Sequence, residues 1–439
     1  MKRITLAILL AFFALAQTAI SQTHKRIKIN SHSQANVNRL ADLGIDLRCG
    51  ASHHEHSSTI DISNEELGLL RENNISYQVV IDNLNEFYQK NSTKDIYRAQ
   101  REFQAERAKT LAFRQGLTQR SSVALNTINN YLQYIGATEE DWNVPLNFPD
   151  VTSSSEVAMG GALTISQVLT ELDEMRAYSQ SKGLNIVSEK ADASGTLNMK
   201  TWGNPLTTIP NPLYDNMLPE NSLSNPEDYI GVGTTAQRFD PQTIYYIRIT
   251  GNESSTTEGT KPQILYTSMI HSRELSAQIG NIFFMWYLIE NYDCNPAIKE
   301  LVDNNELYFI PVVNPDGLKW NEVTEPFGGG MQRKNLRPNT NSSSPDNRGV
   351  DLNRNFDYFW GNAGSGSSPS TTSSGYRGPA AASEPETKII VEFVESRNFK
   401  MAKLISNSIS MFINRLFRRI FRFISREYWF GYCSGNRRK

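Results

Sequence analysis

The sharpest change in the hydrophobic pattern lies between residues 264 and 292. Residues 264–270 are mostly apolar and rich in β-forming side chains, which predicts a buried strand. Apolar residues then recur at helical spacing, at Leu275, Ile279, Ile282, Phe283, Met285, Trp286 and Ile289. His271 and Glu274 lie between the strand and the helix, where their spacing can direct an imidazole and a carboxylate, both good Zn²⁺ ligands, into one crevice. Alone, this pair is a weak motif, and a helix start that happens to carry polar residues is the favoured interpretation.

The same alternation of strand and helix continues on both sides of this segment. Residues 245–250 and 307–313 are predicted strands, and Pro311 suggests an edge or a bulge in the second. Residues 314–317 (Asn-Pro-Asp-Gly) read as a turn. Strands alternating with helices predict an α/β domain with a mixed, mostly parallel sheet covered by helices. Sites in such sheets lie at the carboxyl ends of strands, where His271 and Asn314 are expected.

A smaller pattern occupies the beginning of the chain and predicts a ferredoxin-like domain over residues 22–92. Its elements follow the order β-α-β-β-α-β. The strands are expected at 25–29, 45–48, 59–62 and 75–81, with one helix through Val37, Leu40 and Leu43 and another opened by a capping box at 63–66. The His-rich residues 53–56 could bind a metal, but a solvated loop is the favoured interpretation.

Between these two patterns the chain is polar and less regular. Residues 93–158 combine a charged helix at 95–117 with a Pro- and Ser-rich linker. An amphipathic helix is expected over 163–180, and residues 195–241 read as a surface insertion. The larger domain is therefore placed at residues 159–400.

Composition and charge limit the class of protein. The 439 residues, 39% of them hydrophobic, carry a formal net charge of −2, which suits a soluble globular protein and gives no indication of nucleic acid binding. Lys2 and Arg3 precede the apolar run 4–15, which predicts a signal peptide over residues 1–21 and a secreted or periplasmic protein; an N-terminal membrane anchor is the alternative. Three cysteines allow one disulfide at most, plus a free thiol.

Further polar clusters follow in the larger domain. Arg333 and Arg354 carry permanently charged guanidinium groups, either of which could bind a carboxylate through two hydrogen bonds. Asn353 adds a neutral donor beside Arg354. Asp351 could orient a metal ligand or pair with an arginine. For any one of these arginines, a surface salt bridge is an equally good interpretation.

Together these clusters resemble the zinc carboxypeptidases of the carboxypeptidase A and T type. Over roughly residues 159–401, five segments stand in the family's order: His-Ser-Arg-Glu, Asn-Pro-Asp-Gly, Arg333-Lys334, Asp-Leu-Asn-Arg-Asn-Phe and Ser-Glu-Pro-Glu-Thr. Residues 25–90 look like the propeptide-type domain that precedes some bacterial members. The resemblance implies an incomplete zinc carboxypeptidase fold.

The resemblance also implies roles for individual residues. His271 and Glu274 would be two of three ligands of a Zn²⁺ cofactor. Arg333 would polarise the scissile carbonyl and stabilise the oxyanion. Asn353 and Arg354 would bind the free C-terminal carboxylate of a peptide or protein substrate, which would make the enzyme an exopeptidase.

The sequence departs from the family after residue 400. The family's third ligand is a histidine expected soon after Phe399-Lys400, but no histidine follows His271, and the general-base glutamate has no match. Residues 401–439 hold nine basic residues against one acid, Glu427. This basic tail is either an amphipathic helix suited to an anionic membrane or, as we favour, the product of a slipped reading frame near Met401. We therefore expect impaired activity.

Two rival functions remain open at this stage. One is an aspartoacylase-type zinc deacylase, against which the Asn-Pro-Asp-Gly and Ser-Glu-Pro-Glu-Thr segments weigh. The other is a non-catalytic peptide-binding or membrane-associated protein, which the missing ligand supports.

Overall fold

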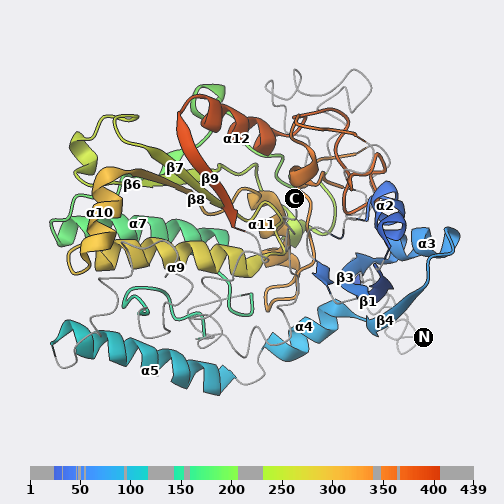
Figure 1. The fold of residues 1–439 in the computed structure, drawn as a ribbon, viewed down its shortest axis with the longest axis horizontal. Coiled ribbons are helices and arrows are strands. Elements are labelled where there is room, and N and C mark those ends of the chain that lie inside the picture. Colours follow the sequence, from blue (N-terminus) through green and yellow to red (C-terminus); the bar gives the residue numbers. More distant parts are fainter. Residues whose placement is uncertain are drawn as a thin grey trace, which may run out of the picture.

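The computed structural model describes residues 24–31, 33–45, 47, 51–53, 56–92, 96–116, 143–152, 159–205, 231–339, 348–362 and 366–405. The predicted signal peptide and the basic tail beyond Ile405 lie outside these residues. The described chain builds two sheets, a four-stranded one near the N-terminus and a five-stranded one that carries the candidate site (Figure 1).

The N-terminal sheet has the predicted element order. Its elements are β1 (His24–Asn30), α2 (Gln34–Asp42), β2 (Ala51–His53), β3 (Ser57–Ser63), α3 (Asn64–Glu72) and β4 (Tyr77–Ile81), followed by α4 (Leu84–Ser92). The strand order is β2-β3-β1-β4, and every neighbouring pair is antiparallel. The predicted capping box is present, with Ser63 and Glu66 bonded reciprocally at the start of α3. The second strand lies at 51–53 rather than 45–48; Ile45 and Leu47 are instead buried in this unit's core.

The larger sheet is mixed, with the strand order β5-β6-β8-β7-β9. Its strands are β5 (Ala191–Asp192), β6 (Tyr245–Ile249), β7 (Gln263–Ser268), β8 (Glu306–Ile310) and β9 (Phe399–Ile405). β7 pairs in parallel with β8 and β9, whereas β6 is antiparallel to both β5 and β8. The expectation of a mostly parallel sheet is therefore corrected, because half of the described pairings are antiparallel. β8 is also central, and it ends before Pro311, so this proline marks neither an edge strand nor a bulge.

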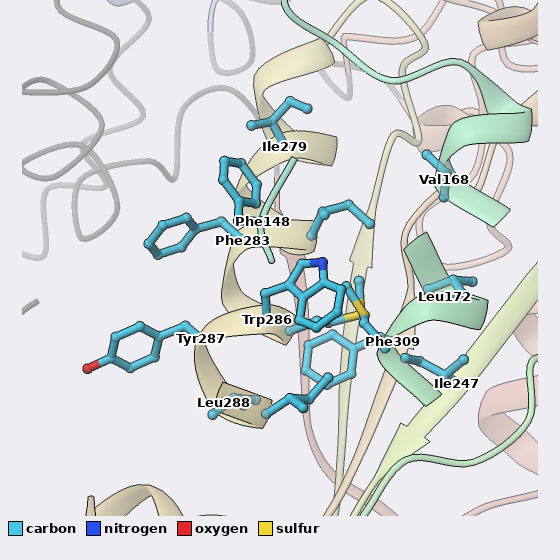
Figure 2. Close-up of a cluster of buried hydrophobic side chains, with 14 of the residues drawn as sticks. Phe148, Val168, Leu172, Ile247, Ile279, Phe283, Trp286, Tyr287, Leu288 and Phe309 are labelled. Carbon is cyan, nitrogen blue, oxygen red and sulfur yellow. The ribbon is translucent and has the colours of Figure 1, made fainter. Parts of the chain in front are cut away.

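Helices cover both faces of this sheet. α7 (Ile165–Ser181) and α9 (Leu275–Asn291) lie on one face, and α12 (Pro385–Glu395) lies on the other (Figure 1). Trp286 of α9 is at the centre of the first core, packed among side chains of α7 and of the sheet (Figure 2). This large buried core holds the start of α9, and with it the candidate site, in a fixed position.

The predicted turn at residues 314–317 is the start of a helix, α11 (Pro315–Thr324). The Asn314 side chain accepts a hydrogen bond from the backbone N–H of Gly317, and Pro315 occupies the first helical position. The same four residue types therefore serve as a helix cap rather than as a free turn. α10 (Pro296–Asn304) begins in the same way, capped by Asn295.

The connecting segment is attached to the larger unit. α5 (Ile96–Arg114), predicted as a charged helix, lies on the same side of the larger unit as α9, with residues 143–152 between the two helices (Figure 1). Glu290 of α9 pairs with Arg114 and accepts hydrogen bonds from the backbone N–H groups of Leu146 and Asn147. One buried carboxylate thus joins α5 and residues 143–152 to α9.

β9 lies at one edge of the sheet and passes the predicted domain boundary at residue 400. It remains paired with β7 as far as Ile405, opposite Ser268. The larger unit therefore extends at least five residues beyond that boundary. Within the described residues, no helix is long and apolar enough to cross a membrane. Cys294 is a free, exposed thiol, whereas Cys49 and Cys433 lie outside the described residues.

Candidate metal centre

His271 is held at the carboxyl end of β7 by the neighbouring loop. The backbone N–H groups of Val313 and Asn314 donate to the carbonyls of Ser268 and Met269, at 3.1 and 3.0 Å. Met269 is fully buried and has a φ of +58°, a left-handed conformation that a residue with a side chain seldom adopts. This turn ends the strand and directs His271 toward the start of α9.

The two predicted metal ligands meet, as their spacing indicated. His271 Nδ1 lies 2.9 Å from Glu274 Oε1, and both side chains are buried. Glu274 Oε2 is also buried and has no hydrogen-bond partner among the described residues. Burial opposes ionisation of Glu274, but the neighbouring His271 and Arg333 outweigh it and lower the pKa of this carboxyl. Glu274 is therefore an ionised donor with one oxygen available.

Asp351 makes both of the contacts that were considered for it, one with the candidate ligand His271 and one with an arginine. Its Oδ1 lies 3.1 Å from His271 Nε2, and its Oδ2 accepts hydrogen bonds from Arg333 Nη2 at 2.9 Å and Arg333 Nε at 3.2 Å. The carboxylate is completely buried. Burial alone would raise its pKa, but Arg333 and His271 hold the pKa well below its usual range. A charged Asp351 thus fixes both the imidazole and the guanidinium.

Asn353 and Arg354 follow Asp351 in a short 3₁₀ helix, η8 (Leu352–Arg354). The Asp351 side chain accepts from the Asn353 backbone N–H at 3.0 Å, which caps this turn. Arg354 donates to the carbonyls of Gly366 and Asn353, and its charge contributes to the lowered pKa of Asp351. Both residues are therefore anchored beside the candidate ligands. That they share one cavity with His271 stays a prediction.

A small cavity of about 20 Å³ adjoins Arg333 where the two units meet. It is lined by Arg333 and Lys334 from the larger unit and by His24, Ser63 and Glu65 from the N-terminal unit, among others. Neither Asn353 nor Arg354 is part of its lining. This cavity is large enough for about one water molecule.

Further contacts join the N-terminal unit to the region around the site. Asn85 and Gln89 of α4 donate to Glu325, at 3.3 and 2.6 Å. On the other side, the backbone N–H of Ser374 donates to Glu66 at 3.2 Å. The N-terminal unit therefore lies against the same loops that carry Arg333.

The donors present match one part of a zinc site. A zinc-bound histidine commonly donates its second ring N–H to a carboxylate, which is the position of Asp351 behind His271. The unpartnered Glu274 oxygen supplies a second donor. A third protein donor is not found here: in the part of the chain that the structure describes, no group of three or more His, Cys, Asp or Glu side chains could hold a metal ion. The His-rich loop gives no support, because the side chains of residues 53–55 lie outside the described residues.

Sequence reasoning missed two residues near this centre. Burial lowers the pKa of Arg273, and its Nη1 is a buried donor without a hydrogen-bond partner among the described residues. Its place inside the His-Ser-Arg-Glu segment was the available signal. Asn335 is the other; it directly follows Arg333-Lys334, but only the folded chain shows what it contacts.

Comparison with known proteins shows which family part of this chain resembles. A family model described as zinc carboxypeptidase matches residues 227–414. Residues 227–414 are therefore similar to the zinc carboxypeptidases. Zn²⁺ is the cofactor named in the family's description. The match also continues beyond residue 400, in agreement with the course of β9.

Curated relatives carry the same kind of name. Metallocarboxypeptidase A of Trichophyton rubrum is 31% identical over 188 residues, which is 43% of this chain and 39% of that protein. Carboxypeptidase B of Helicoverpa zea is 32% identical over 197 residues, covering 43% of each chain. Carboxypeptidase A2 of Rattus norvegicus is 34% identical over 158 residues, covering 36% of each. The chain thus spans about two fifths of the length of the curated relatives it matches.

Among solved structures, the carboxypeptidase A of Helicoverpa armigera is similar with a TM-score of 0.48 and 18% sequence identity. The likeness covers 87% of this chain and 68% of that one. Thrombin-activatable fibrinolysis inhibitor gives a TM-score of 0.45 at 14% identity.

Proposed function

We propose that this protein is an exported zinc-dependent metallocarboxypeptidase that removes C-terminal residues from peptides or proteins, and that the chain as written is impaired. The observation that carries the proposal is the buried arrangement of Glu274, His271 and Asp351. In this arrangement the His271 imidazole, the Glu274 carboxylate and the Asp351 carboxylate lie together at the end of a parallel strand, which supports two candidate zinc donors and an orienting group. The match of residues 227–414 to the zinc carboxypeptidase family supports this assignment.

The proposed roles follow from the positions of the side chains. His271 and Glu274 would hold the metal, and Asp351 would keep the His271 ring in its orientation. When bound, zinc supplies a Lewis acid and lowers the pKa of a coordinated water. These roles require no movement of His271 or Asp351.

Arg333, Asn353 and Arg354 would act on the substrate. Arg333 is held beside the ligands by Asp351, where a guanidinium can stabilise negative charge on the scissile carbonyl oxygen. Asn353 and Arg354 would bind the terminal carboxylate, since a planar guanidinium and a neutral amide suit that group. Only a chain end can satisfy such a clamp, which explains why the expected activity is that of an exopeptidase.

The absence of a third donor among the described residues supports impaired activity. A catalytic zinc site ordinarily has three protein ligands and one position for water. The same observation favours a second candidate function, a non-catalytic protein that still binds peptides. An aspartoacylase-like zinc deacylase is less well supported, because the relatives reported above are named as carboxypeptidases.

Several proposals concern the rest of the chain. Residues 22–92 would be a propeptide-like domain, 93–158 a connecting segment, and 159 onward the incomplete catalytic domain. A signal peptide at residues 1–21 would direct the protein to the secretory route or the periplasm. The basic tail would contact an anionic membrane only if it is a genuine part of the protein.

Metal binding tests the proposed assignment without requiring activity. The chain is loaded with Zn²⁺ or Co²⁺, and stoichiometry and affinity are measured beside His271→Gln and Glu274→Gln. We expect one weakly bound ion, which either substitution removes. Binding that both substitutions leave unchanged would refute this site. In a version of the chain with a corrected reading frame, cleavage of a peptide with a free C-terminus, but not of its C-terminal amide, then separates a carboxypeptidase from the two alternatives.

A further inference from the structure

Asn335 uses all of its side-chain hydrogen-bonding capacity between two parts of the larger unit. Its Nδ2 donates to Glu384 Oε2 and to Glu386 Oε2, both at 2.9 Å. Its Oδ1 accepts from the backbone N–H of Val350 at 2.7 Å and from that of Arg337 at 3.3 Å. The residue is completely buried. An amide with two donor hydrogens and two acceptor positions is fully satisfied in this setting.

The contacts of Asn335 with Val350 connect it to the candidate metal centre. Its backbone N–H donates to the carbonyl of Val350 at 3.1 Å, so both the main chain and the side chain of Asn335 are hydrogen-bonded to Val350. Val350 immediately precedes Asp351, whose carboxylate holds His271 and Arg333. At Gly349, φ is +84° and an added Cβ would lie 1.9 Å from the Asn335 carbonyl oxygen, so the two segments are in close contact. This packing leaves Asp351 little freedom to shift independently of Asn335.

The Asn335 amide donates to two carboxyl groups, those of Glu384 and Glu386, which differ in their surroundings and so in their expected protonation. Glu384 also accepts hydrogen bonds from Trp202 Nε1, Arg337 Nη1 and the Ser383 hydroxyl, at 3.0, 3.1 and 2.7 Å. These donors suit an ionised carboxylate. Glu386 receives the Asn335 amide and its own backbone N–H, and its Oε1 has no hydrogen-bond partner among the described residues. Glu386 therefore has the surroundings of a neutral carboxyl.

The charges around this group agree with that distinction. Burial raises the pKa of Glu386 well above its usual value, and the nearby Asp316 and Glu384 raise it further. Burial also raises the pKa of Asp316 to about 7, although hydrogen bonds from Thr201 and Gly203 and the charge of Arg348 lower it. The other charged groups that face the cluster are Arg337 and Lys388.

We propose that Asn335 is a positioning residue of the candidate metal centre, which acts on His271 through Val350 and Asp351 and takes its own position from Glu384 and Glu386. The inference rests on the proposed function only in assigning His271 to the metal. The hydrogen-bonded path itself exists without a metal. It links the Ser-Glu-Pro-Glu-Thr segment physically to the His-Ser-Arg-Glu segment.

The substitution Asn335→Asp tests this path with a change of one side-chain atom. It replaces the Nδ2 donor by an oxygen that faces two carboxyl groups, so the side chain must move or bind a proton. Adding Glu386→Gln returns an amide donor to that contact. The full chain is prepared without zinc and with ¹⁵N-labelled histidine, and His271→Gln identifies the His271 ring signals. We expect Asn335→Asp to shift the His271 Nε2 resonance and the double substitution to reverse most of the shift.

Asn291→Asp is the matched control. Asn291 is equally buried, but it lies at the end of α9, where its Nδ2 donates to the Tyr287 carbonyl. It should reduce stability without shifting the His271 signals. If Asn335→Asp fails to fold, Asn335→Ala takes its place, because it adds no charge, and it should shift the His271 signals. Unchanged His271 signals in a folded Asn335 variant, or an equal shift in Asn291→Asp, would overturn the proposal. Failure of the wild-type chain to bind zinc would instead count against the proposed function.

Discussion

Asp351→Ala is the substitution that most directly perturbs the centre of the site. The carboxylate is completely buried and receives Arg333 Nη2 at 2.9 Å and His271 Nε2 at 3.1 Å. Its removal takes this acceptor away from a guanidinium of which about one tenth is exposed and from the Nε2 of an imidazole of which about 1% is exposed. Water cannot easily replace the lost contacts.

The expected cost follows from that burial. Breaking a buried charge pair by removing one partner typically costs about 3–5 kcal/mol. At about 1.4 kcal/mol for each tenfold change, the unfolding equilibrium constant should rise by roughly two to four powers of ten. Asp351→Asn keeps an oxygen acceptor but loses the charge, so it should cost about 1.5–3 kcal/mol, the value of one charged hydrogen bond. The penalty should also depend on pH. Because the pKa of Asp351 is lowered in the folded state, its contribution is present above about pH 4 and is lost as the pH falls through the folded-state pKa.

Urea unfolding, followed by tryptophan fluorescence and circular dichroism at pH 7 and again below pH 4, measures this penalty. Asp173→Ala is a suitable control, because Asp173 forms an ion pair with Lys190 on the surface. It should change the free energy of unfolding by less than about 1 kcal/mol. If Asp351→Ala also costs less than about 1 kcal/mol, Asp351 does not hold both charged partners as described, and the account of the site is wrong.

Three further predictions follow from other parts of the structure. Burial raises the pKa of Glu171 to about 7, against a hydrogen bond from Trp286. The folded state therefore binds a proton that the unfolded state releases above about pH 4.3, and stability should fall by up to about 3 kcal/mol as the pH rises from 4 to 8. Glu171→Gln should remove that fall in urea unfolding measured across the range, and an unchanged slope would refute the assignment. Met269→Gly should be more stable than Met269→Ala by about 1 kcal/mol, because both lose the side chain but only glycine tolerates a φ of +58°; the opposite order would show that the turn is unstrained. In a catalytically competent version of the chain, Arg354→Ala should lower kcat/KM for peptides with a free C-terminus, whereas equal cleavage of amidated peptides before substitution would exclude the clamp.

Much of the local structure was predictable because its signals are local. Helix α9 follows from apolar spacing, and the strand before it from its β-forming side chains. The meeting of His271 and Glu274 follows from their separation at the junction of the two. The capping box of α3 was visible as a four-residue pattern.

The errors arose where neighbours rather than sequence decide the outcome. Asn-Pro-Asp-Gly satisfies the rules for a turn and for a helix start alike, and contacts beyond the segment select the helix. Pro311 looked like a strand residue because apolar residues continue past the end of β8. The antiparallel β6 depends on the path of a long connection, which periodicity does not encode.

In the candidate site, too, some residues could be predicted from local sequence and others could not. Its ligands are recognisable as residue types in order, and Asp351 could be foreseen as an orienting group. Asn335, however, contacts residues 15, 49 and 51 positions away in the chain. No local pattern identifies such a residue, because its role depends on the fold bringing three segments together.

Hydrolysis of a chromogenic C-terminal-residue substrate tests the central claim most directly. Residues 22–439 are expressed, loaded with zinc and assayed beside a version whose reading frame is corrected beyond Ile405. The account predicts little or no turnover by the chain as written and chelator-sensitive turnover by the corrected version, because the third ligand and the general base would then be restored. Robust, chelator-sensitive turnover by the uncorrected chain would contradict the proposed impairment. Absence of turnover in both versions would contradict the carboxypeptidase assignment.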